Sequence, residues 1–173
     1  MSLLIKIAAM LLIAFGFAFS GFSIASFYKK KTEILNDIVA MLSVAQTQLR
    51  YACMPVGSLM RILAENRRIS NLGFISSCVK KTEIGKAFPP SWRESIEEEK
   101  ELCRLIPDVL SYLFQFGEEL GSTDLEGQLS CCEYYKQIFQ KELEMRDEQN
   151  KKYSKLFPTL GVMLGISAAV IIV

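Results

Sequence analysis

Apolar residues concentrate at the two ends of the chain, and charged residues lie between them. From Ile7 to Phe27 the sequence has 21 residues without a charge, and from Leu156 to Val173 it has 18 more. At ~1.5 Å rise per helical residue these runs would be about 31 Å and 27 Å long, close to the ~30 Å hydrocarbon core of a bilayer. The pattern therefore predicts a transmembrane helix at each end.

Each apolar run has a second interpretation. The first could be a cleavable signal peptide, with Ala18-Phe19-Ser20 or Ser23-Ile24-Ala25 as the cleavage site. It is longer than the roughly 7 to 15 apolar residues of a signal peptide, which favours a span. The second could be a buried core helix. Its small residues, among them Gly161 and Gly165, and its lack of a polar face favour a packed transmembrane helix.

Lysines flank both runs on their inner sides. Lys29, Lys30 and Lys31 follow the first run, and Lys151, Lys152 and Lys155 precede or adjoin the second. Basic residues beside a span stay in the cytoplasm, so both clusters are expected there. The prediction is a transmembrane helix at 1–28, a cytoplasmic domain at 29–155 and a transmembrane helix at 156–173.

The central segment shows a helical period and no period of two that would indicate strands. Its first helix has apolar residues at steps of three and four, namely Ile34, Ile38, Met41, Leu42, Ala45 and Leu49. Pro55 ends that helix, a short helix closes near Asn66, and a third amphipathic stretch runs over 69–79. The predicted fold class is all-α, with a cytoplasmic bundle of about six helices between the two spans.

Local signals predict where the later helices begin. Ser91-Trp92-Arg93-Glu94 and Thr123-Asp124-Leu125-Glu126 both have the form of a capping box. Pro107 is expected in the first turn of the helix between them, which ends at Gly121. The first of these helices carries an acidic run that is either a solvated face or an interaction patch, made of Glu97, Glu98, Glu99 and Glu101.

Gly117 is the unusual residue of this pattern. A glycine inside a helix costs about 1 kcal/mol relative to alanine, so close approach of another backbone is the expected reason for it. The surrounding segment is the candidate site, made of Phe116, Gly117, Glu118, Glu119, Leu120 and Gly121. Its residues are expected either to pack inside the bundle or to contact a partner, and the acidic surface of Glu118 and Glu119 with the Glu97–Glu101 run is the expected docking surface.

Composition argues against several classes of function. A net charge of +1 offers no field for nucleic acid, and the absence of histidine removes the commonest general base and metal ligand. The sequence has neither a phosphate-binding glycine loop nor a C-x-x-C pair. No catalytic residue, cofactor site or metal site is predicted, and the five cysteines are expected to be reduced and mostly buried. A third alternative is an enzyme, for example a thiol-dependent transferase that uses Cys131 or Cys132.

The order of several motifs resembles the stage III sporulation protein AB family of endospore-forming bacteria. The residues that carry the resemblance are Ser20-Gly21-Phe22 with Ala25, then Leu35, Leu42, Leu49, Tyr51 and Pro55, then Phe116-Gly117-x-x-Leu120-Gly121 with Asp124 and Gln128, and finally Leu160-Gly161 with Gly165. That family is similar in its helical domain to the F platform proteins of type II secretion and type IV pilus machines.

The resemblance implies a non-enzymatic platform subunit in a secretion-like complex between mother cell and forespore. It implies a multi-pass protein of the mother-cell membrane around the forespore, with its central domain cytoplasmic. Its implied partners are a cytoplasmic secretion-type ATPase, other stage III sporulation membrane proteins and membrane lipid, with a homo-oligomer as a further expectation. The alternative is a membrane-anchored adaptor or regulator that recruits a cytoplasmic partner outside any secretion machine.

Overall fold

The computed structural model describes the backbone of residues 2–172 and the side chains of residues 26–149, 151 and 163. Within this described backbone the chain contains helices and no strands, which confirms the predicted all-α class. The helices are α1 (Ser2–Ala52), α2 (Val56–Glu65), the 3-10 helix η1 (Arg67–Ile69), α3 (Gly73–Glu83), α4 (Phe88–Glu98), α5 (Lys100–Leu105), α6 (Leu110–Glu119) and α7 (Leu125–Ile172).

The chain divides into two compact units. The helical unit is Lys31–Glu144, and the terminal unit combines Met1–Lys30 with Met145–Val173. The two predicted spans lie in the terminal unit, outside the residues whose side chains are described except for 26–28 and Met163. Of the helices that can be assessed from described residues, none is apolar over a sufficient length to cross a membrane. The predicted spans therefore stay predictions.

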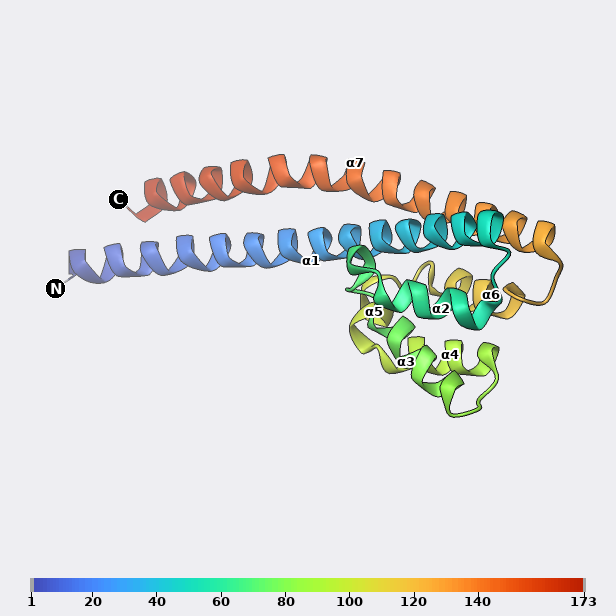
Figure 1. The fold of residues 1–173 in the computed structure, drawn as a ribbon. Coiled ribbons are helices and arrows are strands. Elements are labelled where there is room, and N and C mark those ends of the chain that lie inside the picture. Colours follow the sequence, from blue (N-terminus) through green and yellow to red (C-terminus); the bar gives the residue numbers. More distant parts are fainter. Residues whose placement is uncertain (1, 173) are drawn as a thin grey trace. The chain divides into compact units, whose positions relative to one another are not determined.

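Helix α1 is the central helix of the helical unit. In Figure 1 its second half lies between α7 and the group of short helices α2 to α6. Ala40, Met41 and Leu42 are all buried, and three consecutive helical residues point in directions about 100° apart. This part of α1 is thus covered on more than one side, whereas the sequence pattern predicted a single apolar stripe.

The short helices pack in a chain of pairs beneath α1. Helix α2 packs on α3, α3 on α4, and α4 on both α5 and α6. An aromatic row joins these helices to α7, with edge-on ring contacts from Phe74 to Trp92, Trp92 to Phe116 and Phe116 to Tyr135 at centroid distances of 5.0, 5.8 and 5.8 Å. All four side chains are buried, so this row forms the centre of the core beside the candidate segment.

The predicted start of α4 is wrong. The helix begins at Phe88, three residues before Ser91, with prolines in its first turn. The Ser91 hydroxyl is inside the helix and donates to the Ala87 carbonyl oxygen at 2.8 Å, so it does not act as a cap. Proline is favoured in the first turn of a helix because its φ is helical and because it has no N–H that would lack an acceptor there. This preference explains the earlier start of α4.

The predicted starts of α6 and α7 are also shifted. Helix α6 begins at Leu110, and Pro107 lies in the turn before it. At the start of α7 the cap is Asp124 and not Thr123, because the Asp124 carboxylate accepts from the Gly127 N–H at 3.0 Å. That bond satisfies a backbone donor of the first turn, which is the role of an N-cap side chain.

Candidate functional site

The six residues of the candidate segment divide between core and surface. Phe116, Gly117 and Leu120 are buried, and Glu118, Glu119 and Gly121 are exposed. The buried residues give the segment a packing role inside the helical unit. Its role as a partner contact rests on the exposed residues and stays a prediction.

Gly117 lets α6 lie directly against the Trp92 ring. A β-carbon at position 117 would lie 2.0 Å from the Trp92 Cδ1 atom and 2.4 Å from its Nε1 atom. The Trp92 Nε1–H donates to the Leu113 carbonyl oxygen at 2.8 Å, which fixes the ring in this position. The predicted close approach exists, but its partner is an indole ring from α4 and not a second backbone.

Gly121 is required by the turn that follows α6. Leu120 has φ −63° and ψ 121°, Gly121 has φ +84°, and the Ser122 N–H donates to the Glu119 carbonyl oxygen at 3.1 Å. These values describe a type II turn, whose third residue favours glycine because of its positive φ. A β-carbon there would also lie 2.8 Å from a Val56 methyl group, so α2 closes over the turn.

Glu119 links α6 to α7 through a buried tyrosine. The Tyr135 hydroxyl donates to the Glu119 carboxylate at 2.8 Å, while the Tyr135 side chain is only 1% exposed. Burial, followed by the interaction with Glu119, raises the pKa of Tyr135 above its usual range. Removal of Glu119 would leave a buried hydroxyl without this acceptor, so Glu119 supports the fold as well as the surface.

Glu118 has a partner of its own on the surface. Its carboxylate forms an ion pair with Arg93 of α4, and the Arg93 guanidinium also lies 4.7 Å from the centre of the Phe114 ring. Both charged side chains remain about half exposed. Such an exposed pair contributes little to stability, so Glu118 is available to a partner at small cost.

The acidic run is interrupted at Glu99 and does not form a uniform solvated face. Glu98 forms an ion pair with Lys81 at 2.8 Å. Glu99 lies between α4 and α5, and its carboxylate accepts from the Phe74 N–H at 2.6 Å and from the Gly73 N–H. It therefore caps the N-terminus of α3, and burial raises its pKa. Glu97 and Glu101 stay exposed.

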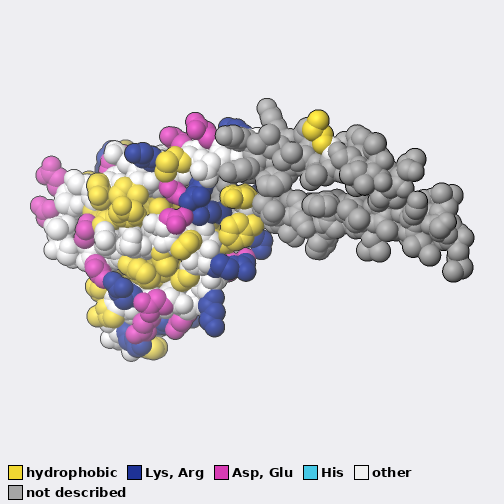
Figure 2. All heavy atoms as spheres, turned by 180° about the vertical axis from the view of Figure 1, so that it is seen from behind, with side chains coloured by type: hydrophobic (Ala, Val, Ile, Leu, Met, Phe, Trp, Pro, Cys, Tyr) yellow, Lys and Arg dark blue, Asp and Glu magenta, His cyan; other side chains and the backbone are white. Residues whose placement is uncertain are grey.

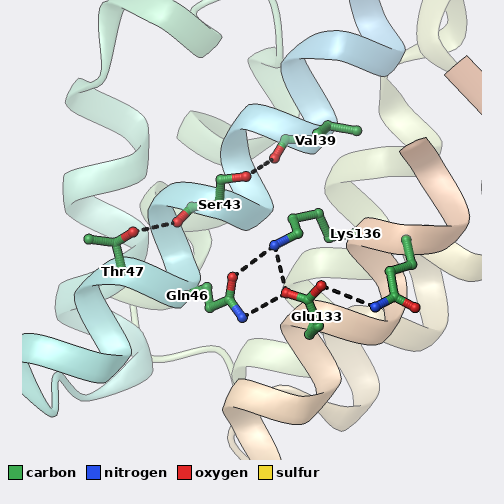
Figure 3. A network of polar contacts seen from close by, with 7 residues as sticks. Val39, Ser43, Gln46, Thr47, Glu133 and Lys136 are labelled. Atoms are coloured by element: carbon green, nitrogen blue, oxygen red, sulfur yellow. Dashed lines mark hydrogen bonds and ion pairs between the residues drawn. The ribbon is translucent and has the colours of Figure 1, made fainter. Parts of the chain in front are cut away.

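A polar cluster that the sequence pattern did not reveal joins α1 to α7 (Figure 3). Gln46 donates from Nε2 to Glu133 at 2.9 Å and accepts at Oε1 from Lys136 at 3.0 Å. Glu133 also accepts from Lys136 at 2.6 Å and from Gln137 at 3.1 Å. These donors, Lys136 first, lower the pKa of Glu133 to about 2. We call Gln46, Glu133 and Lys136 the α1–α7 clasp.

Each member of the clasp looks like an ordinary surface residue in the sequence. Gln46 falls on a polar position of the α1 pattern, and Glu133 and Lys136 are spaced three residues apart as in many exposed helical ion pairs. The contact between Gln46 and Glu133 joins positions 87 residues apart. Only the arrangement of the helices shows that they meet.

Several of the five cysteines have thiols that burial makes less acidic. Burial raises the pKa of Cys78 and Cys132 to about 11, and burial together with Cys132 and Glu119 raises that of Cys131 to about 12. A thiol with so high a pKa holds almost no thiolate at neutral pH, which counts against Cys131 or Cys132 as a nucleophile. Cys53 is exposed. Among the described residues, no group of three or more His, Cys, Asp or Glu side chains is arranged to hold a metal ion.

Comparison with known protein families gives a match over nearly the whole chain. A family model described as stage III sporulation protein AB matches residues 6–173, which includes the whole helical unit and both apolar runs. Neither the curated proteins nor the solved structures contain a significant match to the chain.

Proposed function

Because the chain belongs to the stage III sporulation protein AB family, it takes part in sporulation, and we propose that it acts as a non-enzymatic platform subunit of a secretion-like complex between mother cell and forespore. Other stage III sporulation proteins are its partners by family membership. A cytoplasmic secretion-type ATPase is the further partner that we propose, and the helical unit is the part presented to it.

The proposal includes a multi-pass location in the mother-cell membrane around the forespore. Two features of the sequence support it, namely the apolar runs at 7–27 and 156–173 and the lysines on their inner sides. The helical unit then lies in the cytoplasm, and membrane lipid surrounds the two terminal segments.

The observation that carries the proposal is the pairing of α1 with α7. Contacts from Gln46 to Glu133 and Lys136 hold the two helices together within the helical unit. Gln46 lies late in α1 and Glu133 lies early in α7, and Figure 1 shows that the two helices run in opposite directions within the helical unit. The chain therefore enters and leaves the helical unit at the same end. Two membrane connections at one end leave the other surfaces of the unit open to a cytoplasmic partner.

The exposed acidic residues of α4 and α6 are the proposed docking surface for the ATPase. Arg93 of α4 reaches Glu118 of α6, and Glu97 lies one helical turn after Arg93 on the same exposed face of α4. Glu98, Glu99 and Glu119 already bind inside the helical unit. Glu97 and Glu118 are consequently chosen for exchange, because both are exposed and neither belongs to the core.

Cross-linking in sporulating cells tests this proposal. The full chain is compared with a variant carrying Glu97→Lys and Glu118→Lys, and each is cross-linked, purified and examined by mass spectrometry. Recovery of the ATPase should fall roughly fivefold or more when two surface charges are reversed. The control reverses two exposed carboxylates elsewhere, Glu65→Lys with Glu144→Lys, and should recover the ATPase as the parent does.

The adaptor hypothesis makes a different prediction for the same experiment. An adaptor outside any machine would cross-link to a single cytoplasmic partner, without an ATPase and without further stage III sporulation proteins. Equal recovery of the ATPase from the parent and from the Glu97 and Glu118 variant would leave the platform but reject its acidic docking surface.

A further inference from the structure

One end of the helical unit, which we call the Lys31 end, is closed by the chain segments 66–72, 99–101 and 106–109. Asn71 of the first segment donates to the Asp37 carboxylate of α1 at 2.8 Å. Asp108 of the third segment forms an ion pair with Lys31 of α1 at 3.3 Å. These contacts place both segments beside the first turns of α1 in the helical unit.

Three carboxylates at the Lys31 end bind groups that belong to the unit. Asp37 binds Asn71 and is only 7% exposed, and Asp108 binds the buried Lys31. Glu99 of the middle segment caps α3 through the Phe74 N–H, which holds that segment next to the first one. Each of these three negative charges therefore has a partner within the unit.

The basic side chains at this end are directed outward. Those of the three segments are Arg67 and Arg68 of η1 and Lys100 of α5, Arg104 follows one helical turn after Lys100 on α5, and all four are exposed. Within the described part of the chain none of the four forms an ion pair. Outside the Lys31–Asp108 pair, the exposed carboxylates nearby are Glu33, Glu65 and Glu101, so cations outnumber anions four to three. Figure 2 shows Lys and Arg side chains along one edge of the helical unit.

Chain connectivity brings a membrane close to the Lys31 end. Phe27, the last residue of the first apolar run, is four residues before Lys31. Four residues span at most ~14 Å even when fully extended. If the run is embedded in a bilayer, the lipid surface lies within that distance of the Lys31 backbone, where the Lys31 end begins.

We propose that Arg67, Arg68, Lys100 and Arg104 form a lipid-binding face that contacts the headgroups of anionic phospholipids. This inference rests on the membrane anchoring under the proposed function and adds a second attachment made by the helical unit. Each Lys or Arg near an anionic leaflet strengthens attraction roughly fivefold, so a few charges are sufficient once the anchor holds the unit at the surface. The attachment would restrict how the helical unit moves on the membrane.

Amide hydrogen exchange of the full chain in lipid vesicles tests the proposal. The chain is placed in vesicles of phosphatidylcholine alone and in vesicles with about 30% phosphatidylglycerol. Exchange at 66–72 should be at least about threefold slower with the anionic lipid, and ~1 M salt should remove the difference because it shortens the Debye length to about 3 Å. The amides of η1 are good reporters because that helix has only three residues.

A variant with Arg67→Gln and Arg68→Gln should lose the dependence on anionic lipid. The matched control, Arg50→Gln with Lys80→Gln, loses the same charge from exposed positions outside the Lys31 end. It should keep the dependence on anionic lipid. If the parent floats with the vesicles but exchanges at 66–72 equally fast in both lipids, the lipid-binding face alone is overturned. The same conclusion follows if both variants lose the dependence on anionic lipid equally. A parent that does not float with vesicles overturns the anchoring and this inference together.

Discussion

At the scale of single residues, the missing side chain of Gly117 determines how α6 packs on α4. The indole of Trp92 occupies the space that a β-carbon would need. Helix propensity is sufficient to mark Gly117 as unusual, because glycine is unfavourable inside a helix. It does not identify Trp92, because the two residues are 25 positions apart and lie on different helices.

Replacement of Gly117 by alanine is expected to destabilise the helical unit by about 3 kcal/mol or more. The added methyl group must displace the Trp92 ring, which causes overpacking and breaks the hydrogen bond to the Leu113 carbonyl oxygen. Urea unfolding of the chain in detergent, followed by fluorescence, measures the loss. Trp92 is the single tryptophan, so its emission reports on this contact directly.

Gly57 supplies the control for that measurement. It lies inside α2, and no atom is within 4 Å of the place of its β-carbon. Gly57→Ala should therefore stabilise the chain by up to about 1 kcal/mol through helix propensity alone. A Gly117→Ala variant that gained stability as Gly57→Ala does would show that the Trp92 contact carries no weight.

Cys53 offers a second test at the same scale. It follows the last residue of α1 with φ +45°, and its N–H donates to the Leu49 carbonyl oxygen at 3.1 Å. Glycine adopts this left-handed conformation without the cost of a β-carbon. Cys53→Gly should raise the free energy of unfolding by about 1 kcal/mol, whereas Cys53→Val should lower it because a β-branched residue fits a positive φ poorly. Unchanged stability in both variants would contradict the expectation.

At the scale of secondary-structure elements, the helices are largely predictable and their ends are not. The three-and-four spacing of apolar residues places α1, α6 and the first part of α7 correctly. Competing end signals cause the errors. At α4 the prolines before Ser91 determine the start, and at α7 Asp124 caps in place of the adjacent Thr123. A side-chain cap from a distant element, such as Glu99 on α3, leaves no local signal at all.

The α1–α7 clasp predicts a specific dependence of stability on pH. The pKa of Glu133 is about 2 in the folded chain and its ordinary value is 4.5. A lowered pKa means that the stabilisation by ionised Glu133 is complete above pH 4.5 and is lost as the pH falls towards 2. The side chain is 41% exposed, so solvent screening limits this contribution to less than about 1 kcal/mol.

Glu133→Gln tests this dependence by comparison with the parent. At pH 6 the variant should be less stable, and the difference in the free energy of unfolding should shrink as the pH falls from 4.5 towards 2. Glu126→Gln, which removes an exposed carboxylate near the start of α7 and outside the clasp, serves as the control. A difference in the free energy of unfolding that stays constant from pH 6 to pH 2 would show that the charge of Glu133 does not stabilise the contact between α1 and α7.

At the scale of the whole molecule, the class of fold can be predicted from the sequence. The packing of the short helices is known only from the structure. The packing is hard to predict because α1 is buried on more than one side. Polar residues of α1 such as Asp37 and Gln46 contact other parts of the helical unit and do not simply face solvent. In the candidate segment the pattern identified the residues but not their division into buried Phe116, Gly117 and Leu120 and exposed carboxylates.

Residues 30–150, expressed without the two apolar runs, are expected to fold as a soluble helical monomer or weak oligomer. The helical unit has its own core, and its helices are connected by polar contacts within it. Far-UV circular dichroism and gel filtration check this expectation. A spectrum dominated by sheet or coil, or a chain found only in aggregates, would contradict it.

The predicted topology is checked with a membrane-impermeant thiol reagent on intact cells. A cysteine placed near Met1 or after Val173 should react, and Cys53 and Cys103 should not. Cys53 is the informative native thiol because it is exposed, so it should react readily once the cells are opened. Labelling of Cys53 in intact cells would reject the two-span arrangement.

The central position of α1 has a consequence for biosynthesis. Its partner contacts in α7 come 87 residues later in the chain, from Gln46 to Glu133. At roughly 5 to 20 residues per second, a ribosome needs about 4 to 17 s to make that stretch. During this interval the face of α1 that carries Gln46 has emerged or is emerging without its contacts to α7. A chain that stalls before Leu125 leaves this surface open to chaperones and proteases, so the last helix to be made also completes the protection of the first.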